Sequence, residues 1–138
     1  MNQDDKLREF FRRFALASLG PEPEKVADCY ETSFLAAGPK GGAAFRNDNA
    51  FLSWLREVHA FNARTGMTSM TAGEIDEMPV GGGYTLATVE WAATFQRRAA
   101  PIRVRISYLL RWSDEGPKVA AYISHEDQED AMRANGLL

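Results

Sequence analysis

Three consecutive segments near the C-terminus alternate apolar and polar residues and are separated by short turns. They cover residues 84–97, 102–112 and 119–125. Because side chains along a β-strand point alternately to opposite faces, this pattern predicts an antiparallel meander with one apolar face. That face would carry Trp91 and Tyr108, with His125 at its end. A curved sheet with helices packed on such a face forms a pocket, and these side chains would line it.

The positions of the two turns decide which residues face one another. A first loop at 98–101 predicts that Trp91 lies opposite Tyr108, and we place the second loop at 113–116. A slip of one residue in the second hairpin would move polar residues onto the apolar face. It would also expel two apolar residues, Val119 and Ile123. We favour the register without the slip because it keeps the apolar face continuous.

The opposite face of the predicted meander is mixed in character. Leu109, Ala92 and Tyr122 alternate there with charged and hydroxyl-bearing residues, namely Thr88, Glu90, Thr94, Arg103, Arg105, Ser107 and Arg111. Such a face suits either water or a hydrated interface with a second subunit. The arginines are therefore interpreted as solvated or interfacial residues rather than as a nucleic-acid site.

Helices are predicted on both sides of a first strand. An apolar stripe at 3.6-residue spacing runs over 7–18, and a short helix begins near Pro23, since proline suits a first helical turn. Asp48 lies in a group of capping residues before a third helix that ends at Gly66. Strands are expected at 32–37 and 67–78, a loop around Gly41 and Gly42, and a last helix at 127–134. The predicted class is α+β, with helices on one face of a curved, mostly antiparallel sheet.

Bulk composition excludes several classes of protein. With 138 residues the chain suits one domain over 1–138. The net charge of -3 argues against nucleic acid as a partner. One cysteine, Cys29, argues against a disulfide framework, and the charged N-terminus is unlike a signal peptide. No apolar run approaches the roughly 20 residues that span a bilayer. We therefore expect a soluble, cytoplasmic protein without membrane partners.

The order of elements resembles the nuclear transport factor 2-like fold, which is shared with ketosteroid isomerase and the SnoaL-like polyketide cyclases. The resemblance covers nearly the whole chain and rests on small motifs in sequence order: Phe10-Phe11-Arg12-Arg13-Phe14, Phe34-Leu35-Ala36-Ala37-Gly38-Pro39, Ala50-Phe51-Leu52-Ser53-Trp54-Leu55, Tyr84-Thr85-Leu86 through Glu90-Trp91, Ser107-Tyr108-Leu109-Leu110 and Tyr122-Ile123-Ser124-His125-Glu126-Asp127. It implies a cone-shaped domain, a conical pocket for a small hydrophobic or polycyclic ligand, and a homodimer through the convex sheet face. None of these motifs is a catalytic signature, and the fold itself does not determine function.

The candidate site residues allow two interpretations. Trp91 and Tyr108 would form a ligand platform or simply pack in the core. His125 and Asp76 are the candidate acid or base residues, because isomerase chemistry needs such a group beside a tyrosine in an apolar cavity. Glu90 is assigned to the outer face.

Tyr30 is a second possible hydroxyl donor, while Trp54 and His59 lie on the third predicted helix and are candidate ligand contacts. Two histidines without characteristic spacing predict no metal site, and no cofactor is expected. The leading hypothesis is a small-molecule-binding protein. The alternatives are an isomerase or cyclase and a non-catalytic module that only dimerises.

Overall fold

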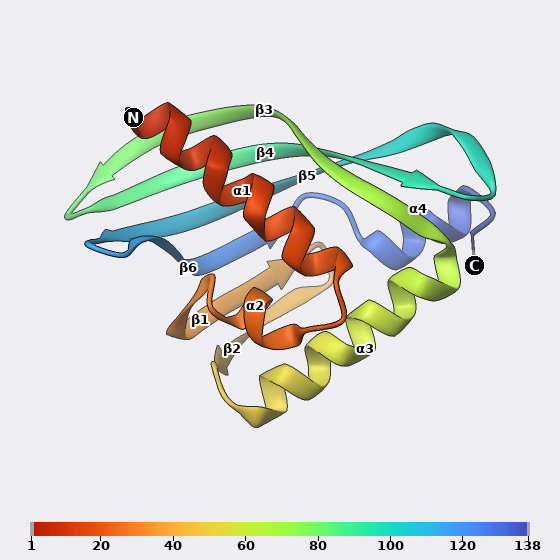
Figure 1. Cartoon of the computed structure of the whole chain (residues 1–138), viewed down its shortest axis with the longest axis horizontal. Coiled ribbons are helices and arrows are strands. Elements are labelled where there is room, and N and C mark those ends of the chain that lie inside the picture. The colour runs from red at the N-terminus through yellow and green to blue at the C-terminus, as the bar shows by residue number, and fades with distance from the viewer. Residues whose placement is uncertain (1, 138) are drawn as a thin grey trace.

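The computed structural model describes residues 2–137 and confirms the α+β class (Figure 1). The elements in chain order are α1 (Gln3–Leu19), α2 (Pro23–Ala27), β1 (Tyr30–Gly38), β2 (Gly41–Arg46), α3 (Asn49–Thr65), β3 (Met67–Gly81), β4 (Tyr84–Phe95), β5 (Arg98–Ser113), β6 (Gly116–Ser124) and α4 (Gln128–Ala134). Each predicted helix is present. One strand, β2, was not predicted and replaces the loop expected around Gly41 and Gly42.

The six strands form one open, mixed sheet in the order β2-β1-β6-β5-β4-β3. Neighbouring strands are antiparallel except β1 and β6, which are parallel. Figure 1 shows α1 crossing in front of the long strands, with α2 and α3 on the same side. The face that α1 covers is called the inner face below. Among residues 2–137, no helix combines the length and the apolar character needed to cross a membrane.

Helix α1 packs its apolar stripe onto the inner face. Its first turn is capped by Asn2, whose side-chain oxygen accepts a hydrogen bond from the Asp5 backbone N–H at 2.9 Å. Phe11 is fully buried, with its ring centroid 6.0 Å from that of Trp91 and 5.0 Å from that of Tyr108. Aromatic contacts of this kind stabilise the folded state by more than the burial of their apolar area alone would. The two aromatic residues expected on the inner face are therefore held there by α1.

Helix α3 begins and ends where its capping residues predict. The Asp48 side chain accepts a hydrogen bond from the Phe51 backbone N–H at 3.1 Å. At the other end Gly66 adopts a φ of 79°, a left-handed conformation in which a side chain would be strained. Phe51 and Leu55 are buried on the side that faces the sheet. The helix thus forms one wall of the space beneath the inner face.

The first hairpin is shifted from the predicted register by four residues. Its turn is at Gln96 and Arg97, so Trp91 lies opposite Val104 and not opposite Tyr108. The expected pairing is therefore wrong. An even shift leaves every side chain on its predicted face, because the faces alternate with a period of two. Trp91 and Tyr108 both remain on the inner face, with 0% and 2% of their surfaces exposed.

The second hairpin contains a β-bulge. Near the turn Leu110 lies opposite Val119, as predicted, but the next pair is Leu109 with Ala121. The extra residue, Ala120, shifts the strand by one position, and a bulge of this kind reverses the faces of everything beyond it. As a result Tyr122 points inward, while Ile123 is half exposed on the outer face. The predicted register is correct up to Val119 and wrong after it.

Candidate functional site

A cavity of about 560 Å³ lies between the inner face of the sheet and the helices. Its walls come from α1, α3, β1, β2 and the inner face of β4, β5 and β6, and its rim includes the start of α4. Aromatic side chains and a few polar groups are among the residues that line it. The lining includes Tyr30, Trp54, Asn62, Trp91, Tyr108 and Tyr122.

Three tyrosines from three strands converge on this cavity. The ring centroid of Tyr122 lies 6.3 Å from that of Tyr30 and 6.3 Å from that of Tyr108. Tyr108 and Tyr30 are almost entirely buried, and Tyr122 is partly buried. Tyr122 is a site residue that the sequence analysis missed. The signal for it was the one-residue slip that was rejected, since that slip turns Tyr122 inward.

The tyrosine hydroxyls have unused hydrogen-bonding capacity. The Trp91 indole N–H donates to the Tyr108 hydroxyl oxygen at 2.9 Å, which leaves the Tyr108 O–H able to donate. No residue between 2 and 137 forms a hydrogen bond with the hydroxyl of Tyr30 or Tyr122. Burial raises the pKa of all three tyrosines, and their mutual proximity adds to the effect for Tyr30 and Tyr108. At neutral pH they are uncharged groups that can donate or accept.

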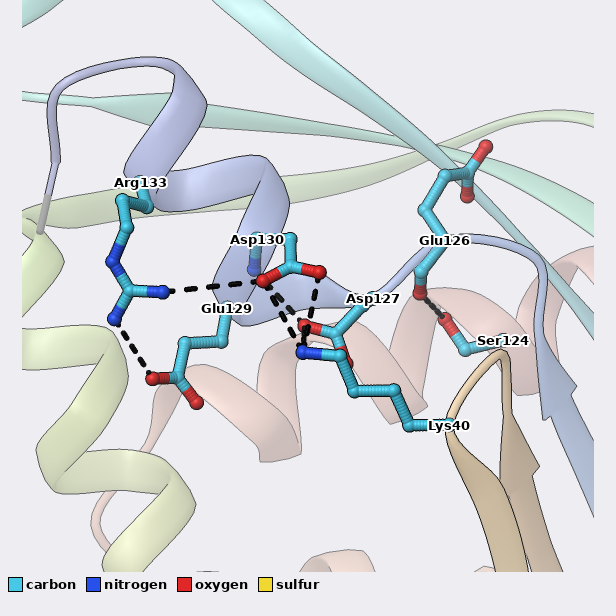
Figure 2. A network of polar contacts seen from close by, with 7 residues as sticks. All are labelled: Lys40, Ser124, Glu126, Asp127, Glu129, Asp130 and Arg133. Carbon is cyan, nitrogen blue, oxygen red and sulfur yellow. Dashed lines mark hydrogen bonds and ion pairs between the residues drawn. The ribbon is translucent and has the colours of Figure 1, made fainter.

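A polar network joins the β1–β2 turn to the start of α4 at the rim of the cavity (Figure 2). The Lys40 Nζ lies 3.6 Å from an Asp127 carboxylate oxygen and 3.2 Å from one of Asp130. Asp127 also caps α4 by accepting the Asp130 backbone N–H at 2.9 Å. That hydrogen bond, together with Lys40, lowers the pKa of Asp127, so its carboxylate is ionised at neutral pH.

The candidate acid and base residues lie outside the cavity. His125 Nε2 is 2.8 Å from the Ser107 hydroxyl, which in turn hydrogen-bonds Thr88 on the outer face. The expected position of His125 on the inner face is therefore wrong, and the cause is the bulge at Ala120. Asp76 pairs with Thr88 across β3 and β4 and is exposed on the same outer face. Glu90 is on the outer face as predicted, 3.3 Å from Arg103.

The remaining candidate residues divide between two places. Trp54 lies on the cavity wall and is 38% exposed, and its ring is stacked with that of Phe45 at 6.2 Å. His59, five residues further along α3, borders a separate hollow of about 70 Å³ between α3 and the α1–α2 connection. It is therefore not brought together with the aromatic residues. Asn62 lines the cavity from the same helix and was not singled out by the sequence.

A second groove, of about 490 Å³, lies on the other side of α1. It is bordered by residues of α1, by the α2 region and by the β5–β6 turn, and both acidic and basic side chains surround it. Cys29 lines this groove, with its thiol 3.6 Å from the Lys25 carbonyl oxygen. Burial raises the pKa of the thiol, which disfavours the reactive thiolate.

No protein-family model matches the chain, and no curated protein matches it either. Solved structures do. An NTF2-like protein with a cystatin-like fold from Novosphingobium aromaticivorans is 15% identical with a TM-score of 0.70, over 98% of this chain and 88% of that one. A domain of unknown function with a cystatin-like fold from Nostoc punctiforme is 12% identical with a TM-score of 0.70, over 99% and 86%.

A third similar structure was solved with a small molecule. It is a protein from Catenulispora acidiphila with a ketosteroid isomerase-like fold, in complex with trimethylamine. It is 14% identical to this chain with a TM-score of 0.59, over 94% of each chain. Likeness at this level of identity establishes the fold and leaves the activity open. The chain therefore has the nuclear transport factor 2-like fold that its sequence resembles.

Proposed function

We propose that the chain, as one domain over residues 1–138, binds a small and mostly apolar molecule in the cavity beneath the inner face. The observation that carries this proposal is the cavity itself, whose volume of about 560 Å³ is within the range of roughly 300–1,000 Å³ common to ligand sites. Its aromatic lining offers apolar contact, and the hydroxyls of Tyr30, Tyr108 and Tyr122 offer a few directed polar contacts. The complex of the Catenulispora protein with trimethylamine supports small-molecule binding by a protein of this fold.

Binding is favoured over catalysis by where the ionisable groups lie. An isomerase or cyclase needs an acid or base beside a tyrosine inside the cavity. The two candidates, His125 and Asp76, are on the outer face. Apart from the tyrosines, the ionisable side chains that border the cavity in the described part of the chain are three carboxylates at its rim, those of Glu126, Asp127 and Glu129. This arrangement supports a binding protein. An isomerase or cyclase is the alternative.

The proposal can be tested by filling the cavity. Val58 lines it from α3, while the neighbouring Glu57 is exposed. Indole, 2-naphthol and a neutral steroid are suitable probes, and each is expected to raise the melting temperature of the wild-type protein. Val58→Trp should abolish that rise, and the matched control Glu57→Trp should keep it. If no probe stabilises the wild type, or if both variants behave alike, the cavity is not a ligand site.

We also propose that the outer face forms a homodimer interface. A row of apolar side chains crosses this face over five strands, because each pairs with the next in register: Met78, Leu86, Leu109, Ala121 and Leu35. Ile123 extends the row. Such a continuous apolar row on a sheet face supports contact with a second copy of the chain. It supports the alternative of a module that only dimerises equally well.

Light scattering at micromolar concentration tests the interface. The wild type should be a dimer, and Leu109→Arg, at the centre of the row, should give a monomer. Val80→Arg is a matched control, because Val80 is also exposed but lies at the end of β3 beyond the row. A wild-type protein that is monomeric at this concentration would contradict the interface.

A further inference from the structure

We propose that the cavity selects molecules that carry a positive charge, that is, an amine or a quaternary ammonium group attached to an apolar body. This inference rests on the proposed binding function and adds the charge of the ligand. The described residues that line the cavity include no lysine, arginine or histidine. The charged residues among them are the three carboxylates Glu126, Asp127 and Glu129.

The inside of the cavity suits an organic cation because it is built from aromatic rings. Tyr30, Tyr108 and Tyr122 line it, and Phe45 and Trp54 form a stacked pair on its wall. The face of an aromatic ring attracts a cation within about 6 Å, and several rings together form the kind of cage that holds quaternary ammonium groups. The faces of the same rings repel an anion.

A hydroxyl that is accessible and has no protein partner in the described part of the chain fits the same class of ligand. Tyr30 is 8% exposed, and its hydroxyl forms no hydrogen bond with any residue between 2 and 137 although its ring borders the cavity. No side-chain nitrogen or oxygen of the described residues is both fully buried and without a hydrogen-bond partner, so the Tyr30 hydroxyl is accessible to a ligand. Its oxygen can accept a hydrogen bond from an ammonium N–H, and the Tyr108 and Tyr122 oxygens lie in the same group of rings. The hydroxyls thus complement the positive end of such a ligand.

The rim adds a negative potential at the entrance. The residues drawn in Figure 2 carry four carboxylates, of Glu126, Asp127, Glu129 and Asp130, and two cations, Lys40 and Arg133, so their formal charge is -2. The Glu126 carboxylate points away from the other three, and this residue contacts Ser124 through its backbone carbonyl oxygen. The Glu126 carboxylate is held in place because it accepts the Arg105 backbone N–H at 2.9 Å. A negative entrance concentrates cations and repels anions, and added salt weakens both effects.

Three probes of similar size separate charge from shape. Benzyltrimethylammonium is the cation, neopentylbenzene is its uncharged carbon isostere, and 3-phenylpropionate is an anion. Binding is followed through the indole N–H signals of Trp54 and Trp91 in two-dimensional NMR spectra. Trp112 is an internal control, because its indole donates to Thr85 outside the cavity lining. The cation should bind about tenfold more tightly than the isostere, and the anion should not bind measurably.

Two substitutions at the rim should change the affinity in opposite directions. Asp127→Asn removes one negative charge and keeps a side chain that can cap α4, so cation affinity should fall about threefold. Lys40→Gln removes the competing positive charge, so cation affinity should rise about threefold. Neither change should affect the isostere. Asp114→Asn is the matched control, since Asp114 is exposed in the β5–β6 turn and its loss of charge should leave cation binding unchanged.

The possible outcomes distinguish the inference from the function on which it rests. Cation preference, lost with salt and shifted in opposite directions by the two rim variants, supports the inference. Equal or tighter binding of the isostere overturns charge selection and leaves a neutral apolar binder. Absence of binding by all three probes overturns both proposals. A cation preference that Asp114→Asn weakens as much as Asp127→Asn does would show that only the net charge of the protein matters, and would overturn the role of the rim.

Discussion

The hydrogen bond between Trp91 and Tyr108 gives the sharpest prediction about stability. In Tyr108→Phe the ring and its aromatic contacts remain, but the hydroxyl that accepts the Trp91 indole N–H at 2.9 Å is removed. Trp91 is fully buried, so its N–H loses its partner away from bulk solvent. A buried donor without an acceptor costs about 1–3 kcal/mol. We therefore expect the free energy of unfolding to fall by about 2 kcal/mol.

This loss can be expressed as a change in melting temperature. A chain of 138 residues has an unfolding entropy of about 0.3 kcal/mol per kelvin, so 1 kcal/mol corresponds to about 3 °C. Tyr108→Phe should then lower Tm by about 6 °C in calorimetry. Tyr122→Phe is the matched control, because no residue between 2 and 137 forms a hydrogen bond with the Tyr122 hydroxyl, and its Tm should change by less than about 1 °C.

A double-mutant cycle shows whether the indole N–H is the cause. In a Trp91→Phe background there is no donor to lose its partner, so the further change Tyr108→Phe should cost about 1 kcal/mol less than it does in the wild type. An equal cost in the two backgrounds would refute the reasoning. The reasoning would also be refuted if Tyr108→Phe in the wild-type background lowered the free energy of unfolding no more than Tyr122→Phe does.

Three further predictions concern a cap, the tyrosines and the cysteine. Asp48→Ala removes the acceptor for the Phe51 backbone N–H and should destabilise the protein by about 1 kcal/mol in urea unfolding, whereas Asp48→Asn should cost far less. Because burial raises the pKa of Tyr30, Tyr108 and Tyr122, these residues ionise first in the unfolded state. Their contribution to stability should be fully present below about pH 10 and should decline above it; in a Tyr84→Phe background, tyrosinate absorbance should appear together with unfolding and not before it. Since burial also raises the pKa of the Cys29 thiol, its reaction with a disulfide reagent at pH 8 should be much slower in the native protein than in urea, and equal rates would show that the thiol is accessible.

Much of the fold could be predicted because its signals are local. Asp48 and Gly66 mark the two ends of α3, and the stripe that includes Phe11 marks the buried side of α1. Strand β2, at 41–46, was missed because its residues do not alternate and are mostly exposed. This segment forms a strand because it pairs with β1, and that pairing cannot be predicted from the local sequence pattern.

The site was harder to predict than the fold because it depends on register. The face of Trp91 and Tyr108 was correct despite a wrong pairing, since the error was an even number of residues. The bulge at Ala120 was not visible, because the alternation up to Val119 is regular and the same register continued beyond it keeps Ile123 on the apolar face. That one residue placed His125 outside and Tyr122 inside, and so changed the cavity from one with an imidazole to one with a third tyrosine.

The bulge at Ala120 also links the two proposed activities through one genetic event. Tyr122 serves the cavity and Ile123 extends the apolar row, and both owe their sides of the sheet to the same extra residue. Deletion of the Ala120 codon would exchange the faces of these two residues, so that Ile123 would point into the cavity and Tyr122 would lie on the outer face. Relatives that lack one residue at this point of β6 should therefore differ from this chain both in the ligand that they bind and in their subunit contacts.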